Sequence, residues 1–458
     1  MKRRTVLVCT GTRPEVIKLA PVYHALAACG IDAQVLHTGQ HGPVVNPLFH
    51  FFRISPHWKF RLAHAEFDAS WLETEFDVKP RQRFPEHISE SSLSRLAAQI
   101  LRRVDPVIHV SRPDAVLVQG DTISALMCAL AAFYARVPVG HVEAGLRTGG
   151  PDPFPEELNR RLIARIARWH FTPTRQATRN LLREGVQSGI HLVGNTVVDA
   201  VHQTVRMLDA RSTRAALLPR DLTRFVDRQR QRRLLVVTAH RRENWGEPIR
   251  NIAGAVLDIA TAVPDCAVVW PLHPNPQIRE MVLTVLDRAS SRIRERIHAS
   301  EPLEYAPMLW VLRRSAMVLT DSGGVQEEAA TLGRPVIVLR DSTERPEVIT
   351  SKGGVLAGAS RKRVRKIVLD ILASPERYTA MCLRRNPFGD GQASERIAQI
   401  LAEDLSIASV APADISTKRR GATRPAQDPR DDGSGRTSRS RRAGALLGAR
   451  RGPTFESP

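Results

Sequence analysis

Short apolar runs alternate with longer segments of helical pattern over most of the chain. Most of these runs carry no regular polar alternation, as expected for strands covered on both faces of a sheet. Buried strands that alternate with helices predict an α/β fold with parallel sheets and crossover helices. The runs that predict strands are residues 5–9, 33–37, 115–119, 137–142, 191–193, 234–238, 267–271, 317–320 and 336–339.

The predicted strands form two series, separated by residues 195–231, which are helical in pattern and then strongly charged. We therefore expect two domains in tandem, residues 1–200 and 201–384. Pro375 and the segment 386–391 interrupt the last helical patterns. A final helix near residues 392–404, within a segment of about 385–405, is expected to return to the first domain.

Composition restricts the class of protein. The 458 residues are 42% hydrophobic and 25% charged, which is ordinary for a globular protein with a core. No apolar run approaches the 18 residues of a membrane span, and the short run after Met1 predicts a strand rather than a signal peptide. The five cysteines have no metal-binding spacing. We expect reduced thiols and a cytoplasmic protein without a membrane span.

The formal net charge of +20 raises the question of nucleic acid. Residues 418–458 contribute eleven Lys and Arg against four Asp and Glu, and their only aromatic residue is Phe455. This composition predicts a disordered basic tail over residues 406–458. We find no RNA-binding motif and no basic patch with interleaved aromatic residues, so no specific nucleic-acid partner is expected. The remaining positive charge suits an anionic substrate.

The first candidate site follows the predicted strand 5–9. Gly11 permits a tight turn, Thr12 can cap the next helix, and Pro14 suits its first turn. The free N–H groups at such a helix start favour an anion. Arg13 and Lys18 add positive charge there. Alone, this pattern also fits a capped helix with two surface cations.

Three carboxylates lie in or near the turns after the next strands. Asp121 follows the run 115–119 and fits equally well as a helix cap or as an active-site carboxylate. Glu143 stands in a polar cluster directly after an apolar strand, which packing does not explain. Glu156 opens a helix, where the helix dipole also favours it. Ligands bind outside the carboxyl ends of parallel strands, so these groups are candidate acid–base residues.

His240 ends the first strand of the second series, together with two arginines. An imidazole in such an anion site can donate a proton near neutral pH. His273, after the following strand, is a weaker candidate. No pair of histidines has zinc-ligand spacing, so no metal is expected.

The sharpest pattern follows the predicted strand 317–320. Gly323 and Gly324 at a helix start let the backbone approach a phosphate closely, and Ser322 adds a hydroxyl donor. Glu328 lies further along the helix, where a carboxylate can accept hydrogen bonds from ribose hydroxyls. Downstream, the stretch 340–347 puts another arginine at a strand end. The pattern predicts a cradle for a nucleoside diphosphate.

Taken together, these stretches resemble the non-hydrolysing UDP-N-acetylglucosamine 2-epimerases. The resemblance covers about residues 3–405 and implies the GT-B type of fold, with two Rossmann-like domains facing across a cleft. It also implies a homodimer, and a reaction without NAD or metal in which UDP is eliminated to give 2-acetamidoglucal and then added back. The stretches that carry it are residues 11–21, 39–41, 120–122, 138–149, 155–160, 194–201, 240–243, 321–328, 343–347 and 386–392.

By this resemblance, the carboxylates at the sugar are Asp121, Glu143 and Glu156, and His240 assists the diphosphate. The residues that would hold UDP are Arg13, Lys18, Ser322, Gly323, Gly324, Glu328 and Arg345. The resemblance does not assign individual carboxylates to the two faces of C2.

The chain departs from the family pattern in two loops. Residues 42–46 have fewer polar side chains than the loop that forms an allosteric UDP-GlcNAc pocket in some bacterial members, which leaves regulation by UDP-GlcNAc open. Residues 303–308 have Leu and Met where Gln and Phe are common beside the uracil, so base contacts are expected to differ.

Several functions remain alternatives at this point. The same machinery can epimerise a related UDP-sugar, such as a 2,3-diacetamido uronic acid, or release UDP and free ManNAc by hydrolysis. A GT-B glycosyltransferase needs an acceptor groove and gives three acidic residues at the sugar no clear role. A binder of nucleic acid or membrane surfaces would depend on the basic tail.

Overall fold

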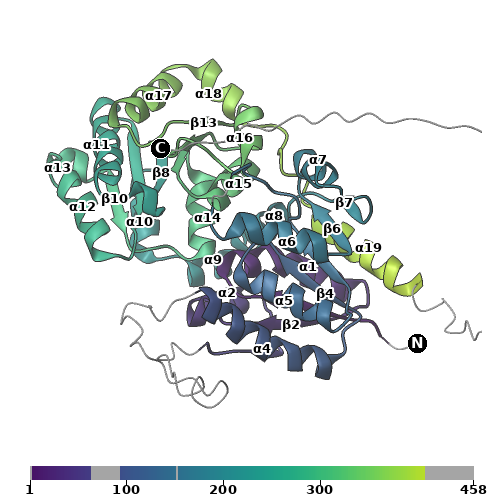
Figure 1. Cartoon of the computed structure of the whole chain (residues 1–458). Helices are drawn as coiled ribbons and strands as arrows, with labels where there is room; N and C mark the ends of the chain where they lie inside the picture. Colours follow the sequence, from purple (N-terminus) through teal and green to yellow (C-terminus); the bar gives the residue numbers. More distant parts are fainter. Residues whose placement is uncertain (1–2, 63–92, 151–152, 408–458) are drawn as a thin grey trace, which may run out of the picture. The chain divides into compact units, whose positions relative to one another are not determined.

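A computed structural model of the chain describes residues 3–62, 93–150 and 153–407. Within these residues, two parallel β-sheets are each accompanied by helices (Figure 1). The predicted α/β class with parallel sheets is therefore confirmed. The predicted disordered tail, apart from its first two residues, lies outside the described residues.

The first sheet has the strand order β3-β2-β1-β4-β5-β6-β7, and every neighbouring pair is parallel. The order turns back on itself between β1 and β4, which is where doubly wound sheets bind ligands. The strands are β1 (Thr5–Thr10), β2 (Asp32–His37), β3 (Trp58–Lys59), β4 (Ala115–Gln119), β5 (Val139–Val142), β6 (Trp169–Thr172) and β7 (Ile190–Leu192).

The second sheet repeats this arrangement with the order β10-β9-β8-β11-β12-β13, again all parallel. Its order reverses between β8 and β11. The strands are β8 (Arg233–Thr238), β9 (Cys266–Pro271), β10 (Ile297–Ser300), β11 (Met317–Thr320), β12 (Val336–Val338) and β13 (Gly354–Leu356).

Helices connect successive strands in both halves. Those before β8 are α1 (Arg13–Ala28), α2 (Asn46–Phe51), α4 (Leu93–Ser111), α5 (Ile123–Tyr134), α6 (Glu156–Ile166), α7 (Arg175–Arg183), α8 (Thr196–Asp209), α9 (Arg211–Leu217) and α10 (Arg220–Arg228). Those after β8 are α11 (Glu247–Ala262), α12 (Pro276–Leu286), α13 (Ser291–Arg294), α14 (Tyr305–Arg314), α15 (Gly323–Thr331), α16 (Pro346–Thr350), α17 (Arg361–Ala373), α18 (Pro375–Met381) and α19 (Ala393–Ile407). Two 3-10 turns, Gly42–Val45 and Arg242–Asn244, complete the described helical segments.

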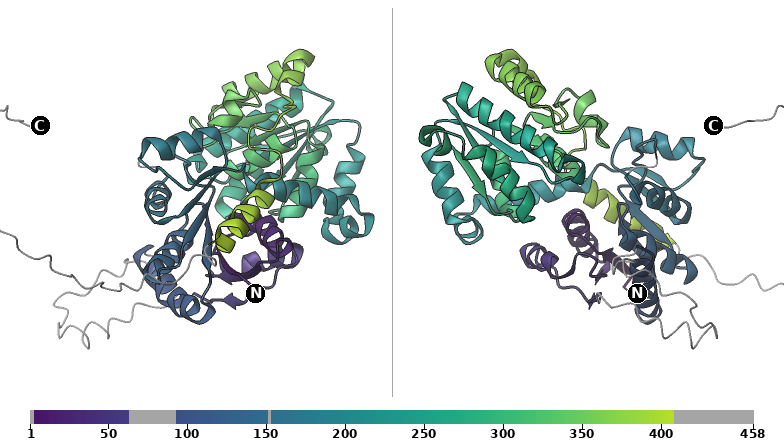
Figure 2. Two further views of the ribbon diagram at one scale, coloured as in Figure 1. Left: turned by 90° about the vertical axis from the view of Figure 1, so that its right-hand side faces the viewer. Right: turned by 60° about the vertical axis from the view of Figure 1, so that its left-hand side comes forward.

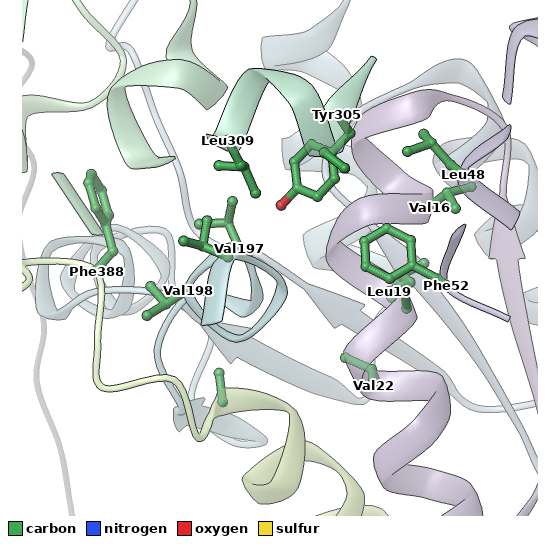
Figure 3. Packing of buried hydrophobic residues seen from close by; sticks show 14 of the residues in the cluster. Val16, Leu19, Val22, Leu48, Phe52, Val197, Val198, Tyr305, Leu309 and Phe388 are labelled. Carbon is green, nitrogen blue, oxygen red and sulfur yellow. The ribbon is translucent and has the colours of Figure 1, made fainter. Parts of the chain in front are cut away.

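One hydrophobic cluster runs through both halves of the fold. Figure 3 shows its middle, where Tyr305 of α14 lies beside Phe52 and Val197 of α8 lies near Leu309. The ring centroids of Phe52 and Tyr305 are 5.9 Å apart. Because burial of such side chains contributes about 1.5–3 kcal/mol each, this shared core holds the described residues in one compact unit.

The last helix packs against the first. Helix α19 lies along α1 in the views of Figures 1 and 2 and contacts it. The indole Nε1 of Trp169 donates a hydrogen bond of 2.6 Å to Asp404 of α19, and the backbone N–H of Ser394 donates one of 2.8 Å to Asp199. These contacts tie the end of the described chain to its N-terminal half.

Every strand expected from the apolar runs is present, with ends that differ by at most two residues. The expectations did not include β3, β6, β10 and β13. The domain boundaries and the cleft between two domains stay predictions. Among the described helices, none combines the length and the apolar character needed to cross a bilayer.

Candidate active site

The residues singled out in the sequence follow strands at or next to the two reversal points. Gly11 follows β1, Asp121 follows β4 and Glu143 follows β5. In the second sheet, His240 follows β8 and Ser322 follows β11. The carboxyl ends of neighbouring parallel strands meet at one edge of a sheet, so each set is gathered at one edge.

Four buried charged residues form a closed ring. The Lys18 ammonium lies 2.6 Å from Glu143 Oε1 and 3.0 Å from Glu327 Oε2. The Arg345 guanidinium pairs with the same two carboxylates, 3.2 Å from Glu143 through Nη2 and in a short contact with Glu327 through Nε. All four side chains are at most 10% exposed. Lys18 and Glu143 belong to the first half, whereas Glu327 and Arg345 belong to the second.

Glu143 sits in an unusual local environment. Its φ of 67° lies in the left-handed region, which costs a residue with a Cβ on the order of 1 kcal/mol and is commonest at functional sites. The Gln119 side chain of β4 also donates to its carboxylate. Burial alone raises the pKa of Glu143, but the charges of Lys18 and Arg345 outweigh burial and lower the pKa. The group is therefore held ionised.

Asp121 is held by Arg160 rather than by a helix start. Arg160 of α6 contacts Asp121 Oδ2 through Nε at 2.7 Å and through Nη2 at 2.6 Å. The cap of α5 is Thr122, whose hydroxyl accepts from the backbone N–H of Ala125 at 3.0 Å. The capping role is thus filled by the neighbouring residue, and the Asp121 carboxylate is left for another task.

Glu156 begins α6 and is half-buried. It stands one helical turn before Arg160, so it lies on the helix face that reaches Asp121. Within the described part of the chain, no hydrogen bond or ion pair is made by the Glu156 carboxylate. Its neighbour Glu157 is buried and pairs with Arg160 at 3.1 Å.

The turn after β8 is fixed by Asp321, which is fully buried. Its carboxylate accepts from the backbone N–H of His240 at 2.9 Å and of Arg241 at 2.9 Å, and from the Asn244 amide at 2.8 Å. Burial lowers the pKa of the His240 imidazole, the Asp321 charge opposes this, and His273 adds to the lowering. The hydrogen bonds to Asp321 hold the backbone that presents His240 in place.

Glu15 performs a similar task in the first half. Its buried carboxylate accepts from the backbone N–H of Gly11 at 2.7 Å and of Thr12 at 2.6 Å, and from the hydroxyl of Thr122 at 2.6 Å. Burial raises the pKa of Glu15 to about 7 despite these hydrogen bonds. The turns after β1 and β4 are therefore joined through one carboxyl group.

Arg13 connects the start of α1 with the second half. Its Nη2 lies 3.2 Å from the carboxylate of Glu304, the residue before α14. The Arg13 side chain is 30% exposed, so part of its guanidinium remains accessible. Within the described residues, no group of three or more His, Cys, Asp or Glu is arranged to hold a metal ion.

The start of α15 leaves room next to Gly324. The Ser322 hydroxyl caps the helix by accepting from Val325 N–H at 3.4 Å. A Cβ on Gly323 would stand 3.1 Å from Glu344 Oε1, whereas a Cβ on Gly324 would meet only Ser322 Oγ, at 4.0 Å. Packing therefore does not require a glycine at position 324.

This difference yields a prediction for Gly324→Ala. The free energy of unfolding of the variant is expected to equal that of the wild type or to exceed it by up to about 1 kcal/mol, because alanine is the better helix former. Its affinity for UDP is expected to fall by about tenfold or more, since the added methyl group takes the place of a close phosphate. Urea denaturation and calorimetric titration measure the two quantities; unchanged UDP affinity would remove Gly324 from the cradle.

Glu328 yields a second prediction, on pH. Burial, reinforced by the neighbouring charge of Glu327, raises the pKa of the Glu328 carboxyl to about 8. The folded chain keeps this proton to a higher pH than the unfolded chain, so the contribution of Glu328 to stability is lost as pH rises from about 4.5 to about 8.

Glu328→Gln removes this titration. The variant is expected to gain at least about 1 kcal/mol of unfolding free energy relative to the wild type between about pH 5 and about pH 9. Urea denaturation of both chains at each pH measures the difference, in which the titration of Glu15 cancels. A difference that is constant over this range would contradict the raised pKa.

Several residues that build this site were not predicted from the sequence. Glu327 and Asp321 stand inside the 321–328 pattern, but their roles depend on partners from other strands. Glu15 and Arg160 also stand inside stretches that carry the family resemblance. A signal for Glu327 does exist: two adjacent carboxylates, Glu327 and Glu328, occur in a short helix whose other residues are mostly small or apolar.

Comparisons with known proteins agree with one another. The family model of UDP-N-acetylglucosamine 2-epimerase matches residues 24–402. The UDP-N-acetylglucosamine 2-epimerase of Escherichia coli K12 is 40% identical over 403 residues, which are 86% of this chain and 98% of that protein.

Solved structures are similar along almost their whole length. The UDP-GlcNAc 2-epimerase of Neisseria meningitidis, bound to UDP-GlcNAc, has a TM-score of 0.74 at 35% identity and covers 87% of this chain and 100% of its own. The enzyme of Methanocaldococcus jannaschii, in complex with UDP-GlcNAc and UDP, has a TM-score of 0.68 at 31% identity, with 87% and 99% covered.

Proposed function

The chain belongs to the UDP-N-acetylglucosamine 2-epimerase family, a family of isomerases, and from this premise we propose that it interconverts UDP-GlcNAc and UDP-ManNAc. The proposed route eliminates UDP to give bound 2-acetamidoglucal and then adds UDP back. The observation that supports this most is the ring of charges, in which Arg345 of the second half and Lys18 of the first half both contact Glu143, the carboxylate that follows β5.

The proposed reaction is balanced without a redox partner. A base takes the proton from C2 while the bond from C1 to the UDP oxygen breaks, and a double bond forms between C1 and C2. In the return, UDP bonds to C1 and an acid delivers a proton to the opposite face of C2. Carbon is neither oxidised nor reduced overall, so the proposal needs no nicotinamide cofactor.

We assign the acid–base work at the sugar to Asp121, Glu143 and Glu156. Inversion requires a proton carrier on each face of C2, and carboxylates serve when their surroundings tune the pKa. The three carboxylates have different surroundings, which supports this assignment. Asp121 pairs with Arg160, Glu143 belongs to the buried ring of charges, and Glu156 stands at a helix start.

We assign the UDP moiety to the second half and to the start of α1. His240, presented by the turn that Asp321 holds, is proposed to assist departure of the diphosphate. The residues proposed to bind UDP are Arg13, Lys18, Ser322, Gly323, Gly324, Glu328 and Arg345. Lys18 and Arg345 also contact Glu143, so the cations that hold the leaving group touch a group at the sugar.

The test is incubation of the purified protein with UDP-GlcNAc in D₂O, without added NAD or metal, followed by proton NMR. We expect UDP-ManNAc that carries deuterium at C2, because the abstracted proton exchanges with solvent before it returns. UDP with free ManNAc would indicate the hydrolysing reaction instead. An unchanged UDP-GlcNAc, with folded protein that binds UDP, would direct the assignment to a 2,3-diacetamido UDP-sugar and next to glycosyl transfer.

The predicted homodimer and cytoplasmic location stay predictions, and regulation by UDP-GlcNAc stays open.

A further inference from the structure

Glu327 is the most enclosed member of the ring of charges formed by Lys18, Glu143, Glu327 and Arg345. Its side chain has an exposed fraction of 0%. It stands in the middle of α15, and the Asn195 amide at the start of α8 donates to Glu327 Oε1 at 3.1 Å. Each ion pair or hydrogen bond of this carboxylate is with a residue of the candidate site or with the helix start that supports it.

The ring has a definite order of charges. Lys18 and Arg345 each touch both Glu143 and Glu327, so every cation lies between two carboxylates and every carboxylate between two cations. The four formal charges cancel. Moving one cation toward substrate therefore changes its distance to both carboxylates at once.

We propose that Glu327 is a positioning residue of the reaction centre, whose buried carboxylate fixes the Lys18 ammonium and the Arg345 guanidinium against Glu143. This inference rests on the proposed function. Glu327 does not contact the sugar in this proposal. It acts on Glu143 through Lys18 and Arg345, the two cations that both carboxylates contact.

The physical reason lies in the cost of buried charge. Two cations that faced Glu143 alone would leave a net positive charge in a site removed from water, and would turn toward that single carboxylate. Glu327 supplies the second anion, so that Lys18 and Arg345 are held at fixed points between two partners. The Asn195 contact anchors Glu327 itself to α8, which belongs to the shared core.

Charge at Glu143 is set by groups from every element around it. Those that face it are Lys18 of α1, Arg345 before α16, Arg160 of α6 and His141 of β5. Around Glu327 the further titratable neighbour is Glu328. Removing the charge of Glu327 leaves Lys18 and Arg345 less neutralised, so the pKa of Glu143 is expected to fall further.

The test compares Glu327→Gln with the wild-type enzyme in the interconversion of UDP-GlcNAc and UDP-ManNAc as a function of pH. The glutamine variant keeps the shape and loses the charge. We expect kcat to fall by about 10²-fold, because the two cations move toward Glu143. We also expect the acid limb of the pH profile to move down by about one unit or more.

Glu327→Asp separates charge from position and serves if the glutamine chain does not fold. It keeps the anion but shortens its reach, so we expect a lower kcat with the acid limb at the wild-type pH. The matched control is Glu347→Gln: the Glu347 carboxylate accepts a hydrogen bond of 2.7 Å from the Thr174 hydroxyl, which a glutamine oxygen can still accept, and it takes no part in the ring of charges. It is expected to keep the wild-type acid limb.

Loss of stability in both Glu327 variants with an unchanged kcat and acid limb would overturn the inference and leave Glu327 a structural residue. If the wild-type chain itself does not interconvert the two UDP-sugars, the proposed function fails instead. In that case, carboxyl ¹³C NMR titration of glutamate-labelled protein, with Glu143→Gln for assignment, tests the inference. An unchanged Glu143 pKa in Glu327→Gln would then reject it.

Discussion

Glu143→Gln is expected to interconvert UDP-GlcNAc and UDP-ManNAc about 10³-fold more slowly than the wild-type chain. The amide has nearly the shape of the carboxylate but cannot take up or deliver the proton. The effect should be large because Glu143 is buried and is held ionised by Lys18 and Arg345. Initial rates from NMR at saturating substrate give kcat directly.

Binding of UDP should separate this loss from unfolding. The variant is expected to bind UDP at least as tightly as the wild type, since removal of an anion leaves Lys18 and Arg345 more available to phosphate. Glu184→Gln is the matched control, because Glu184 pairs with Arg147 at 2.7 Å. The kcat of this variant is expected to stay within about threefold of the wild-type value. A Glu143→Gln rate within about tenfold of the wild type would remove Glu143 from the acid–base groups.

Arg345→Met is expected to lower the free energy of unfolding by about 3–5 kcal/mol. Without the guanidinium, Glu143 and Glu327 share the single charge of Lys18, and a buried carboxylate is left uncompensated. Burial lowers the pKa of Arg345, but the charges of Glu327, Glu143 and Glu344 outweigh burial and raise it above its ordinary value, consistent with a cation that these partners stabilise. Urea denaturation at neutral pH measures the loss.

Two further variants test the explanation. The double variant of Arg345→Met with Glu327→Gln removes one cation and one anion, and is expected to recover part of the lost stability. Arg361→Met removes one partner of the exposed pair with Asp258 and is expected to cost about 1 kcal/mol or less. If the double variant loses more unfolding free energy than the two single variants lose together, uncompensated charge is not the cause.

The sequence allowed prediction of the fold class because its strands are continuous apolar runs followed by polar turns. Three strands that were not expected lack such a run. β6 reads Trp-His-Phe-Thr and is fully buried, yet its histidine interrupts the apolar pattern. β3 has two residues, and β13 begins with a glycine. In such segments the neighbouring strands, rather than local pattern, determine the conformation.

The candidate site shows the same division. Asp121, Glu143 and His240 are visible in the sequence because each interrupts the apolar pattern at a strand end. The ring of charges is not, because Lys18 meets Glu143 across 125 residues and Arg345 meets it across 202. The first pairing depends on the strand order within the first sheet, and the second on how the two sheets come together; no local pattern records either.

The pairing of α19 with α1 has a consequence for synthesis. Domains generally begin to fold while the ribosome is still adding residues. Here the helix that completes the packing of α1 ends at Ile407, so it is among the last described segments to leave the exit tunnel. Helix α1, which ends at Ala28, therefore has one apolar face uncovered until α19, which begins at Ala393, has been translated. Until α19 arrives, this surface of the nascent chain is exposed to the apolar contacts that lead to aggregation.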